Sequence, residues 1–228
     1  MQIYNSLSKK IEEFEPVQKD KIIIYVCGLT PYDHTHIGHL RTYIAFDFIK
    51  RYLKRKYRVY HIQNITDVDD KIISRCKETG QKPKELTEKI HNEALDLFDA
   101  VGIERADVYP KVTEHVPQII ELIQKIIHNR YAYETQTGVY FDVSSFKVYG
   151  ELSGQDLEKV NAGSRFEPDE TKKNPEDFAL WKVTKNGENP LMEWDCKLKL
   201  RLTEEEYKKL KKAAEENKNI EILSVKDV

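Results

Sequence analysis

The sequence predicts an α/β fold built on a parallel sheet, and three consecutive segments support this. Residues 21–27, "KIIIYVC", form a short apolar run rich in β-branched residues, which is typical of a strand covered on both faces. A helical pattern follows over residues 37–56, and "YRVYHIQNI" at 57–65 has the composition of a second strand. Strand, helix and strand in this order predict a βαβ unit.

The helix over residues 37–56 is expected to pack through one apolar stripe. The residues of that stripe are Leu40, Ile44, Phe48 and Leu53. Before the helix, Gly28 and Pro31 indicate a loop that follows the first strand.

The rest of the chain predicts a mixed set of helices and strands. Apolar residues at helical spacing predict helices over residues 84–100 and 114–129. Residues 131–143 predict a hairpin that turns at 135–138, and residues 156–175 are interpreted as a polar loop. The tail predicts a strand at 197–202, a helix from a capping box at Thr203 and Glu206 to about residue 217, and a strand at 220–223.

Composition narrows the class of protein. The chain has 228 residues with a net charge of -2, so a nucleic-acid partner would need a local basic surface. Its three cysteines are odd in number and far apart, which favours a reducing compartment over a disulfide framework. The N-terminal residues contain no apolar signal-peptide core, and no apolar run is long enough to span a membrane. These features predict a soluble, cytoplasmic protein without a membrane partner.

Residues 25–41, "YVCGLTPYDHTHIGHLR", concentrate groups that can do chemistry. Cys27 ends the first strand, at the edge of an open α/β sheet where ligands bind. His36 and His39 lie where the next helix begins, and the free N–H groups of a helix N-terminus attract phosphates. Gly38 would let a base or a backbone approach closely. The pattern predicts a nucleotide phosphate at the two histidines with Cys27 nearby; the alternative is a histidine-containing turn beside an inert cysteine.

These motifs and their surroundings resemble the cysteinyl-tRNA synthetase family of class I. The resemblance rests on "HIGH" at 36–39, "NITDVDDKII" at 64–73 and "NPEDFALWK" at 174–182, and it covers about residues 1–182. It implies the first half of a class I synthetase Rossmann-like parallel-sheet domain at 1–110, an inserted α+β connective domain at 111–196 and a divergent tail at 197–228. The implied reaction is ATP-dependent activation of cysteine and its transfer to tRNA-Cys by a cysteine–tRNA ligase.

The resemblance also implies roles for individual residues. Cys27 corresponds to the first ligand of a zinc ion that holds the thiolate of the substrate, and zinc prefers such soft ligands. His36 and His39 correspond to catalytic, ATP-binding histidines that stabilise charge on the phosphates, with Mg²⁺ expected beside the nucleotide. The other implied positions are Thr30 and Gly38 at ATP, and Gly28 and Thr66 at the amino acid.

Members of this family continue with further zinc ligands, a "KMSKS" loop and a helical anticodon-binding domain, and these 228 residues contain none of them. The expectation is therefore a truncated chain that is inactive alone, or that needs a second polypeptide or self-association to complete its sheet. Two other functions stay open. One is an ATP-dependent ligase that joins cysteine to an amino sugar, and the other is a non-catalytic binding fragment derived from a synthetase.

Four further features have competing interpretations. Residues 67–70 either contribute aspartates to the site or cap the following helix. The six basic residues within 50–58 either contact RNA phosphates or form a solvated helix face, and the second is favoured. Cys76 is interpreted as a packing residue, and Cys196 is not assigned to the zinc site.

Overall fold

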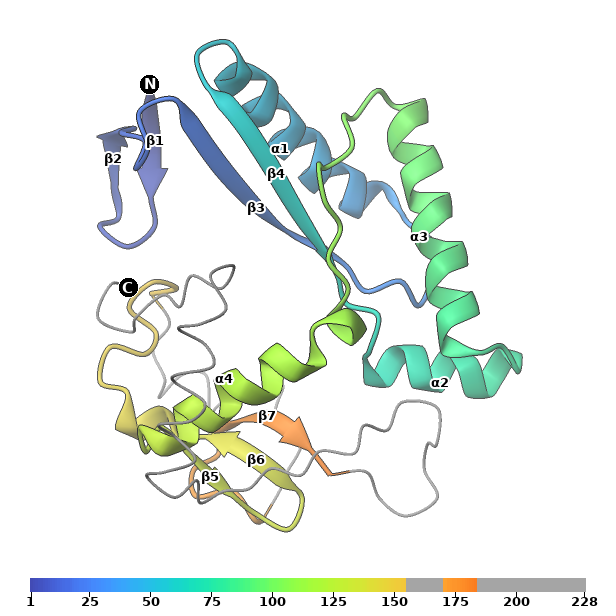
Figure 1. The fold of residues 1–228 in the computed structure, drawn as a ribbon, viewed down its shortest axis with the longest axis vertical. Coiled ribbons are helices and arrows are strands. Elements are labelled where there is room, and N and C mark those ends of the chain that lie inside the picture. The colour runs from blue at the N-terminus through green and yellow to red at the C-terminus, as the bar shows by residue number, and fades with distance from the viewer. Residues whose placement is uncertain (155–169, 184–228) are drawn as a thin grey trace, which may run out of the picture.

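A parallel pair of strands forms the centre of the fold in the computed structural model, which describes residues 1–154 and 170–183 (Figure 1). Strand β3 (Lys21–Leu29) is followed by helix α1 (Ile37–Lys54) and strand β4 (Arg58–Ile65). The two strands pair in parallel, with Lys21 opposite Arg58. The predicted strand–helix–strand unit and its parallel pairing are confirmed.

A second crossover adds a third parallel segment to this sheet. Helices α2 (Asp70–Thr79) and α3 (Pro83–Ala100) lead from β4 to an extended stretch beside it. Two parallel bridges join the stretch to β4, Ile62 with Val108 and Ile65 with Lys111. The order across the sheet is therefore residues 108–111, β4 and β3, and the carboxyl ends of all three meet at one edge.

Helices α1 and α3 cover one face of the sheet, and the other face is open. The main core cluster consists of Val26, Leu29, Leu40, Tyr43, Ala94, Leu95, Phe98 and Ile103. On the opposite face, Ile23 and Tyr25 of β3 are 55% and 60% exposed, and Tyr60 of β4 is 42% exposed. The prediction of a strand covered on both faces is thus wrong for the described residues, because β3 alternates between a helix-covered side and an open one.

The packing stripe of α1 also differs from the predicted one. Leu40 and Leu53 are buried as expected, but Ile44 and Phe48 are 47% and 72% exposed. Tyr43 takes their place, because its ring packs against Phe98 of α3 with centroids 4.9 Å apart. Helical spacing alone is compatible with either of two adjacent apolar stripes on α1, and the contact with α3 decides which one is buried.

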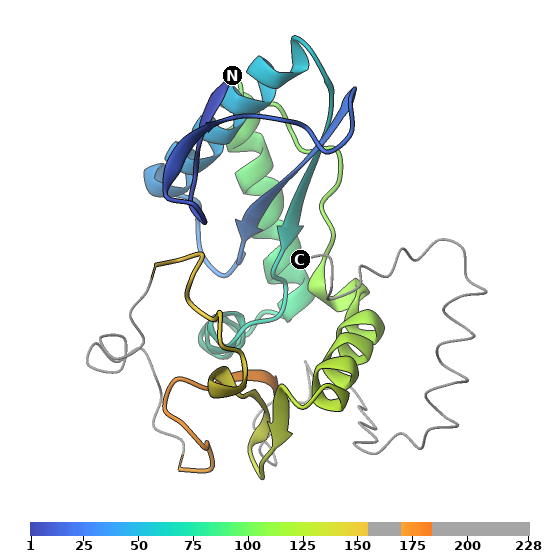
Figure 2. The ribbon, with the colours of Figure 1, turned by 90° about the vertical axis from the view of Figure 1, so that its left-hand side faces the viewer.

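A smaller antiparallel sheet follows a single helix. The 3₁₀ turn η1 (Val112–Glu114) leads into α4 (Val116–His128), and strands β5 (Ala132–Glu134), β6 (Gly138–Phe141) and β7 (Phe178–Lys182) pair in that order, with the turn η2 (Val143–Ser145) after β6. Both ribbon views place this region beyond the carboxyl ends of β3 and β4 (Figure 2). The helix and the hairpin predicted at residues 114–143 are confirmed.

One buried carboxylate holds the smaller sheet together. Asp177 is 0% exposed and accepts bonds from the Tyr133 hydroxyl at 2.6 Å, the Val143 N–H at 2.9 Å and the Asn174 N–H at 3.0 Å. A buried carboxylate is tolerated only when donors satisfy it in this way.

Two remaining segments complete the description. An N-terminal hairpin, β1 (Gln2–Asn5) and β2 (Lys10–Glu13), was not predicted from the sequence. The predictions for residues 197–223, and most of the loop predicted at 156–175, lie outside the described residues. None of the helices in the described ranges has the length and apolar character needed to cross a membrane.

Candidate functional site

The carboxyl end of β3 carries a β-bulge at Cys27. Two residues of β3, Cys27 and Gly28, lie opposite the single residue Asn64 of β4. The thiol-bearing residue is exposed on the open side of the sheet. A Cβ atom on Gly28 would lie 1.5 Å from the Asn64 carbonyl oxygen, so only glycine fits at this position. The requirement for Gly28 thus has a structural explanation that is independent of any substrate.

The two histidines of "HIGH" form one unit at the start of α1. His36 is the N-cap, and its Nδ1 accepts the Gly38 N–H at 3.1 Å. His39 reaches back, and its Nδ1 accepts the His36 N–H at 3.4 Å. Their rings stack with centroids 4.0 Å apart. This is a reciprocal capping box made of imidazoles in place of the usual hydroxyl and carboxylate.

The capping box fixes which ring nitrogen carries the proton. An Nδ1 that accepts a backbone N–H must be unprotonated, so each neutral ring carries its proton on Nε2. Burial, and then the neighbouring His36, lower the pKa of His39, which favours the neutral ring. The capping box uses the backbone N–H groups of His36 and Gly38, so these two are not available to a ligand. The Nε2–H groups of the two rings can face a ligand instead.

The loop between β3 and α1 is tied to the two helices that follow β4. His34 Nδ1 lies 2.8 Å from Glu93 Oε2 of α3, and the Arg75 guanidinium of α2 lies 3.6 Å from Asp33 Oδ1. A small pocket of about 80 Å³ lies along this loop. Its lining includes Leu29, Thr30, Pro31, Tyr32, Asp33, His34, Thr35, His36, His39 and Ile90. Thr30 and both histidines therefore line one pocket.

The aspartates in the loop after β4 have different roles, and one of them caps the following helix. Asp69 caps α2, because its Oδ1 accepts the Lys71 N–H at 2.8 Å. Asp67 is 7% exposed and accepts the backbone N–H of Thr113 at 3.0 Å, which ties the loop to the segment before α4. Asp70 pairs with Lys182 of β7 at 2.8 Å. The capping interpretation is confirmed for Asp69, whereas its neighbours join this edge of the sheet to the region beyond it.

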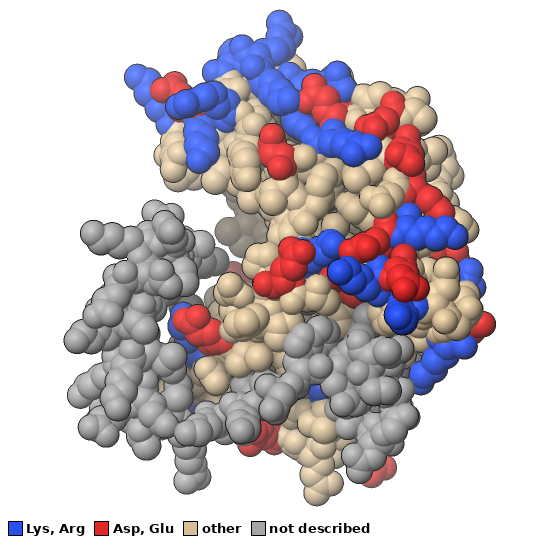
Figure 3. Space-filling model, turned by 45° about the vertical axis from the view of Figure 1, so that its right-hand side comes forward, with Lys and Arg blue, Asp and Glu red and all other residues tan. Residues whose placement is uncertain are grey.

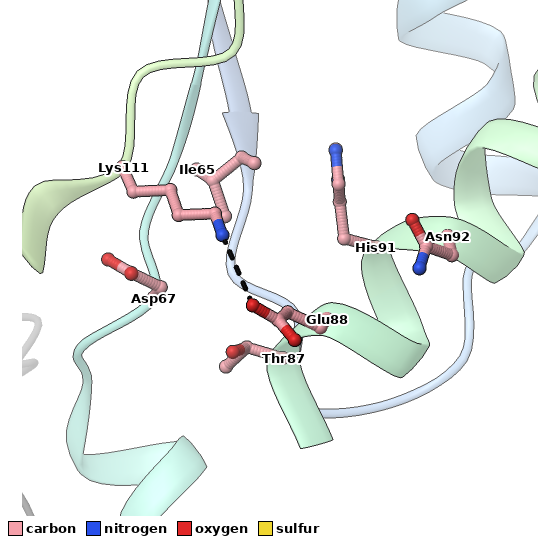
Figure 4. A pocket seen from close by; sticks show the side chains of 7 residues that line it. All are labelled: Ile65, Asp67, Thr87, Glu88, His91, Asn92 and Lys111. Atoms are coloured by element: carbon pink, nitrogen blue, oxygen red, sulfur yellow. Dashed lines mark ion pairs between the residues drawn. The ribbon is translucent and has the colours of Figure 1, made fainter. Parts of the chain in front are cut away.

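A larger cavity of about 240 Å³ lies between the end of β4 and helix α3 (Figure 4). It is lined by Ile65, Asp67, Thr87, Glu88, His91, Asn92 and Lys111. Glu88 and Lys111 pair across it at 3.5 Å. Burial, and then Lys111, lower the pKa of His91, so its ring is held neutral. The opposite charges in the lining compensate each other, which makes this cavity a poor site for a phosphate.

The described residues do not supply a complete metal site. Within residues 1–154 and 170–183, no cluster of three or more His, Cys, Asp or Glu side chains is arranged to hold a metal ion. Among these described residues, Cys27 therefore does not have the three further ligands that tetrahedral zinc requires. Cys196 lies outside the described residues. The other described cysteine, Cys76, is buried beside Ile72, as the packing interpretation predicts.

The basic cluster at residues 50–58 lies at the opposite, amino end of the sheet. Figure 3 shows Lys and Arg gathered at the top of the molecule, where α1 ends and β4 begins. Lys50 is only 2% exposed and donates to the Arg105 carbonyl at 2.7 Å. Arg51 and Lys54 are exposed and pair with Asp47 and Glu104. The interpretation as a solvated helix face is therefore wrong for Lys50, whereas Arg51 and Lys54 lie on the surface of α1.

Several residues around the site were not identified from the sequence. Asn64 opens the quoted "NITDVDDKII" motif, and a polar residue at a strand end was a usable signal. Glu93 and Arg75 gave no signal, because 59 residues separate Glu93 from His34 along the chain. Only the fold brings these tethers to the loop.

Comparisons with known proteins agree on one family. The family model described as tRNA synthetases class I (C) catalytic domain matches residues 13–199. The chain is 53% identical over 189 residues to a cysteine–tRNA ligase of Thermococcus onnurineus and 51% identical over 189 residues to one of Methanococcus maripaludis. Each alignment covers 82% of this chain but 40% of the relative, so the chain spans well under half the length of the curated relatives it matches.

A solved structure resembles the chain more distantly. It is methionyl-tRNA synthetase of Mycobacterium tuberculosis in complex with methionyl-adenylate, with a TM-score of 0.47 and 15% identity over 67% of this chain and 37% of that one. At this TM-score the likeness carries no argument about the site.

Proposed function

The chain belongs to the family of class I (C) tRNA synthetase catalytic domains, and from this premise we propose that it forms the cysteine- and ATP-binding part of a cysteine–tRNA ligase. The observation that carries the proposal is the gathering of Cys27, the histidine pair and Thr66 at the carboxyl edge of one parallel sheet. In an open α/β sheet this edge is where ligands bind.

The nucleotide is proposed to lie against the loop and the first turn of α1. His36 and His39 would donate from Nε2 to phosphate oxygens of ATP, and the charge that develops there as the adenylate forms would be stabilised by these fixed donors. Thr30 lines the same pocket, Gly38 lies against the His36 ring, and Mg²⁺ would accompany the nucleotide. Because the pair is already stacked and capped, little reorganisation accompanies binding.

The amino acid is proposed to lie beside Cys27, Gly28 and Thr66. A zinc ion, which the family resemblance implies, would supply a soft partner for the substrate thiolate, and a hydroxyl would be a poor substitute for that thiolate. Among the described residues only Cys27 fits such a metal, so no step of the reaction is assigned to zinc.

A second polypeptide, or a second copy of this chain, is proposed as a partner. The open face carries exposed Ile23, Tyr25 and Tyr60, and within the described ranges no strand pairs with the outer edge of β3. Exposed apolar surface and an unpaired strand edge are features that partners cover. The tRNA and a cytoplasmic location are part of the same proposal.

Titration calorimetry with ATP and Mg²⁺ tests the nucleotide half of the proposal. The chain should bind ATP in the millimolar range, and His36→Ala with His39→Ala should weaken binding roughly tenfold, since two charge-assisted bonds are lost. His128→Ala, at an exposed position of α4, is the matched control and should bind as the wild type does. No binding at millimolar ATP, or equal weakening in the control, contradicts the assignment.

An activity assay tests the ligase itself. The 228-residue chain should charge tRNA-Cys only when a polypeptide carrying the remaining part of a relative is added, because loss of one electrostatic group alone typically costs about 100- to 1,000-fold in rate. Measurement of mass in solution would show whether a second copy replaces that polypeptide. Charging at full rate by the monomeric chain contradicts the need for a partner. No cysteine-dependent pyrophosphate exchange in any mixture would favour a non-catalytic fragment, and exchange without tRNA charging would favour the amino-sugar acceptor.

A further inference from the structure

We infer that Asn64 is the positioning residue of the amino-acid edge: its side-chain amide holds the β3 bulge that presents Cys27 and connects it to Thr66. This inference rests on the proposed function for its chemical meaning, since Cys27 and Thr66 are proposed to flank the substrate. The geometry that supports it does not depend on that function.

The amide of Asn64 makes three bonds at the end of the two strands. Its Oδ1 accepts the Gly28 N–H at 2.8 Å and the Tyr25 hydroxyl at 2.9 Å. Its Nδ2 donates to the Thr66 hydroxyl at 3.2 Å. One side chain therefore binds the bulge, a residue before it and the loop that follows β4.

The bond to Gly28 replaces a bond that the bulge removes from the ladder. A bulge leaves its extra residue without a regular partner, and an unpaired backbone N–H is costly when it is shielded from water. The Asn64 oxygen satisfies that N–H from the side chain. A regular strand would not need the amide, because the backbone of β4 would supply the partner.

The bulge changes the side of the sheet to which later residues belong. Before it, even-numbered residues such as Ile22 and Val26 are buried against the helices. After it, Leu29 is buried, so the alternation has shifted by one residue. The shift keeps Cys27 on the open side while Leu29 stays in the core, and it directs the following loop towards the histidine pair.

Tyr25 and Thr66 are the two side-chain partners of the Asn64 amide, and each is held in turn by its surroundings. Burial, and then the neighbouring Cys27, raise the pKa of Tyr25, so its hydroxyl remains a donor to Asn64. The Thr66 N–H donates to the Leu29 carbonyl at 3.0 Å, which closes the strand ends immediately after the bulge. Asn64 thus couples the orientation of the Cys27 backbone to that of the Thr66 hydroxyl.

Amide hydrogen exchange of Gly28, measured by NMR on the full chain, tests the inference directly. Asn64→Ala should speed exchange at Gly28 roughly tenfold, the effect of one lost hydrogen bond. Asn64→Asp keeps an acceptor of the same shape and should restore protection at Gly28. Ile103→Val, a core change after α3 at a residue that lines neither pocket, is the control for general destabilisation and should leave Gly28 protected. Unchanged exchange in Asn64→Ala, or no rescue by Asn64→Asp, overturns the inference.

A kinetic measurement links the positioning role to the substrate. In cysteine-dependent pyrophosphate exchange with the completing polypeptide, Asn64→Ala should raise the KM for cysteine several-fold while the KM for ATP changes little, and Asn64→Asp should reverse the effect. A purely structural loss would lower the apparent kcat for both substrates, as is expected of Ile103→Val, and would overturn the link to cysteine. If the wild-type mixture activates no cysteine, the proposed function fails, whereas the exchange at Gly28 still decides the role of Asn64.

Discussion

The two ends of the central sheet differ in how their innermost polar side chains are satisfied. At the amino end these side chains are charged: Lys50 donates to backbone carbonyls and lies beside Glu104, and Lys54 pairs with the same carboxylate. At the carboxyl end they are neutral and bond mainly to the backbone: Asn64 satisfies Gly28, and His36 satisfies Gly38, while ion pairs such as that of Asp70 with Lys182 lie in the loops around them.

This difference indicates which end is structural and which is available to ligands. Lys50 is buried and its three-donor ammonium group is used within the fold, so this residue of the basic cluster contributes to stability and not to recognition. A side chain that bonds a backbone N–H keeps other atoms available, as the Nε2 nitrogens of the histidine pair illustrate. Basic residues in a sequence are therefore a weaker sign of a binding site than polar residues at strand ends.

The largest expected effect lies at the carboxyl end. Gly28→Ala should lower the free energy of unfolding by about 3 kcal/mol, because its Cβ would lie 1.5 Å from a backbone oxygen that cannot move alone. Urea unfolding measures this. Gly38→Ala is the matched comparison, since its Cβ would meet only the His36 ring at 2.9 Å, and that exposed ring can turn. Equal stability losses in the two variants would show that the close approach of Gly28 to the Asn64 backbone does not restrict this position more than Gly38 is restricted.

The next effect tests the amino end. Lys50→Met should cost about 2 kcal/mol, because it leaves the carbonyls of Glu104 and Arg105 without their donor in a buried position. Lys56→Met, at an exposed position just after the end of α1, should change stability by less than about 0.5 kcal/mol. Thermal or urea unfolding of both variants provides the comparison. A stable Lys50→Met protein would contradict the structural role of this cluster.

The pH dependence of stability is a property that the two ends share. Burial, and then Lys50, lower the pKa of His61, which also faces Asp107, Asp47 and Lys54. The unfolded chain therefore takes up a proton first, so stability is lost as the pH falls below about 6.5, by up to about 1.4 kcal/mol for each pH unit per histidine. The lowered pKa values of His39 and His91 act in the same direction.

Urea unfolding at several pH values between 5 and 7 measures the slope of the free energy of unfolding against pH. His61→Gln should reduce the slope, and the remaining dependence should come from the other two histidines. His128→Gln, at an exposed position of α4, should keep the wild-type slope. A slope that His61→Gln leaves unchanged would show that the buried ring is protonated in the folded state.

The smallest effect concerns the tether of the nucleotide loop. His34 and Glu93 are 71% and 40% exposed, so their contact should contribute no more than about 0.5 kcal/mol. A double-mutant cycle of His34→Ala and Glu93→Gln measures it. A coupling well above 1 kcal/mol would mean that the carboxyl end also depends on charge pairing, and the contrast between the two ends would weaken.

Local patterns predicted the elements of this fold but not which surfaces meet. The order of strand and helix from Lys21 to Ile65 followed from composition, and Cys76 was correctly interpreted as a packing residue. The exposure of Phe48 could not be predicted, because Phe98 of a distant helix selects the neighbouring stripe. The burial of Lys50 depends likewise on carbonyls more than 50 residues away.

The site was predictable where chemistry was concentrated in one short motif. Cys27, His36 and His39 lie within thirteen residues of one another, and the fold keeps them at one edge. The role of Asn64 was not predicted, because a bulge depends on the pairing between two strands and neither strand reveals it alone. Likewise, the capping box was not predicted, because histidine is not among the usual capping residues.

The contacts of the loop after β4 determine the order in which the two ends of the sheet are completed during synthesis. Asp67 bonds a residue 46 positions later, and Asp70 bonds Lys182, which is 112 positions later. Synthesis at roughly 5–20 residues per second puts on the order of ten seconds between the emergence of Asp70 and that of its partner. The amino end of the sheet closes with contacts about half as distant along the chain. A nascent chain therefore completes its charged end first, and the edge that carries Thr66 receives its last bond only when β7 has been made.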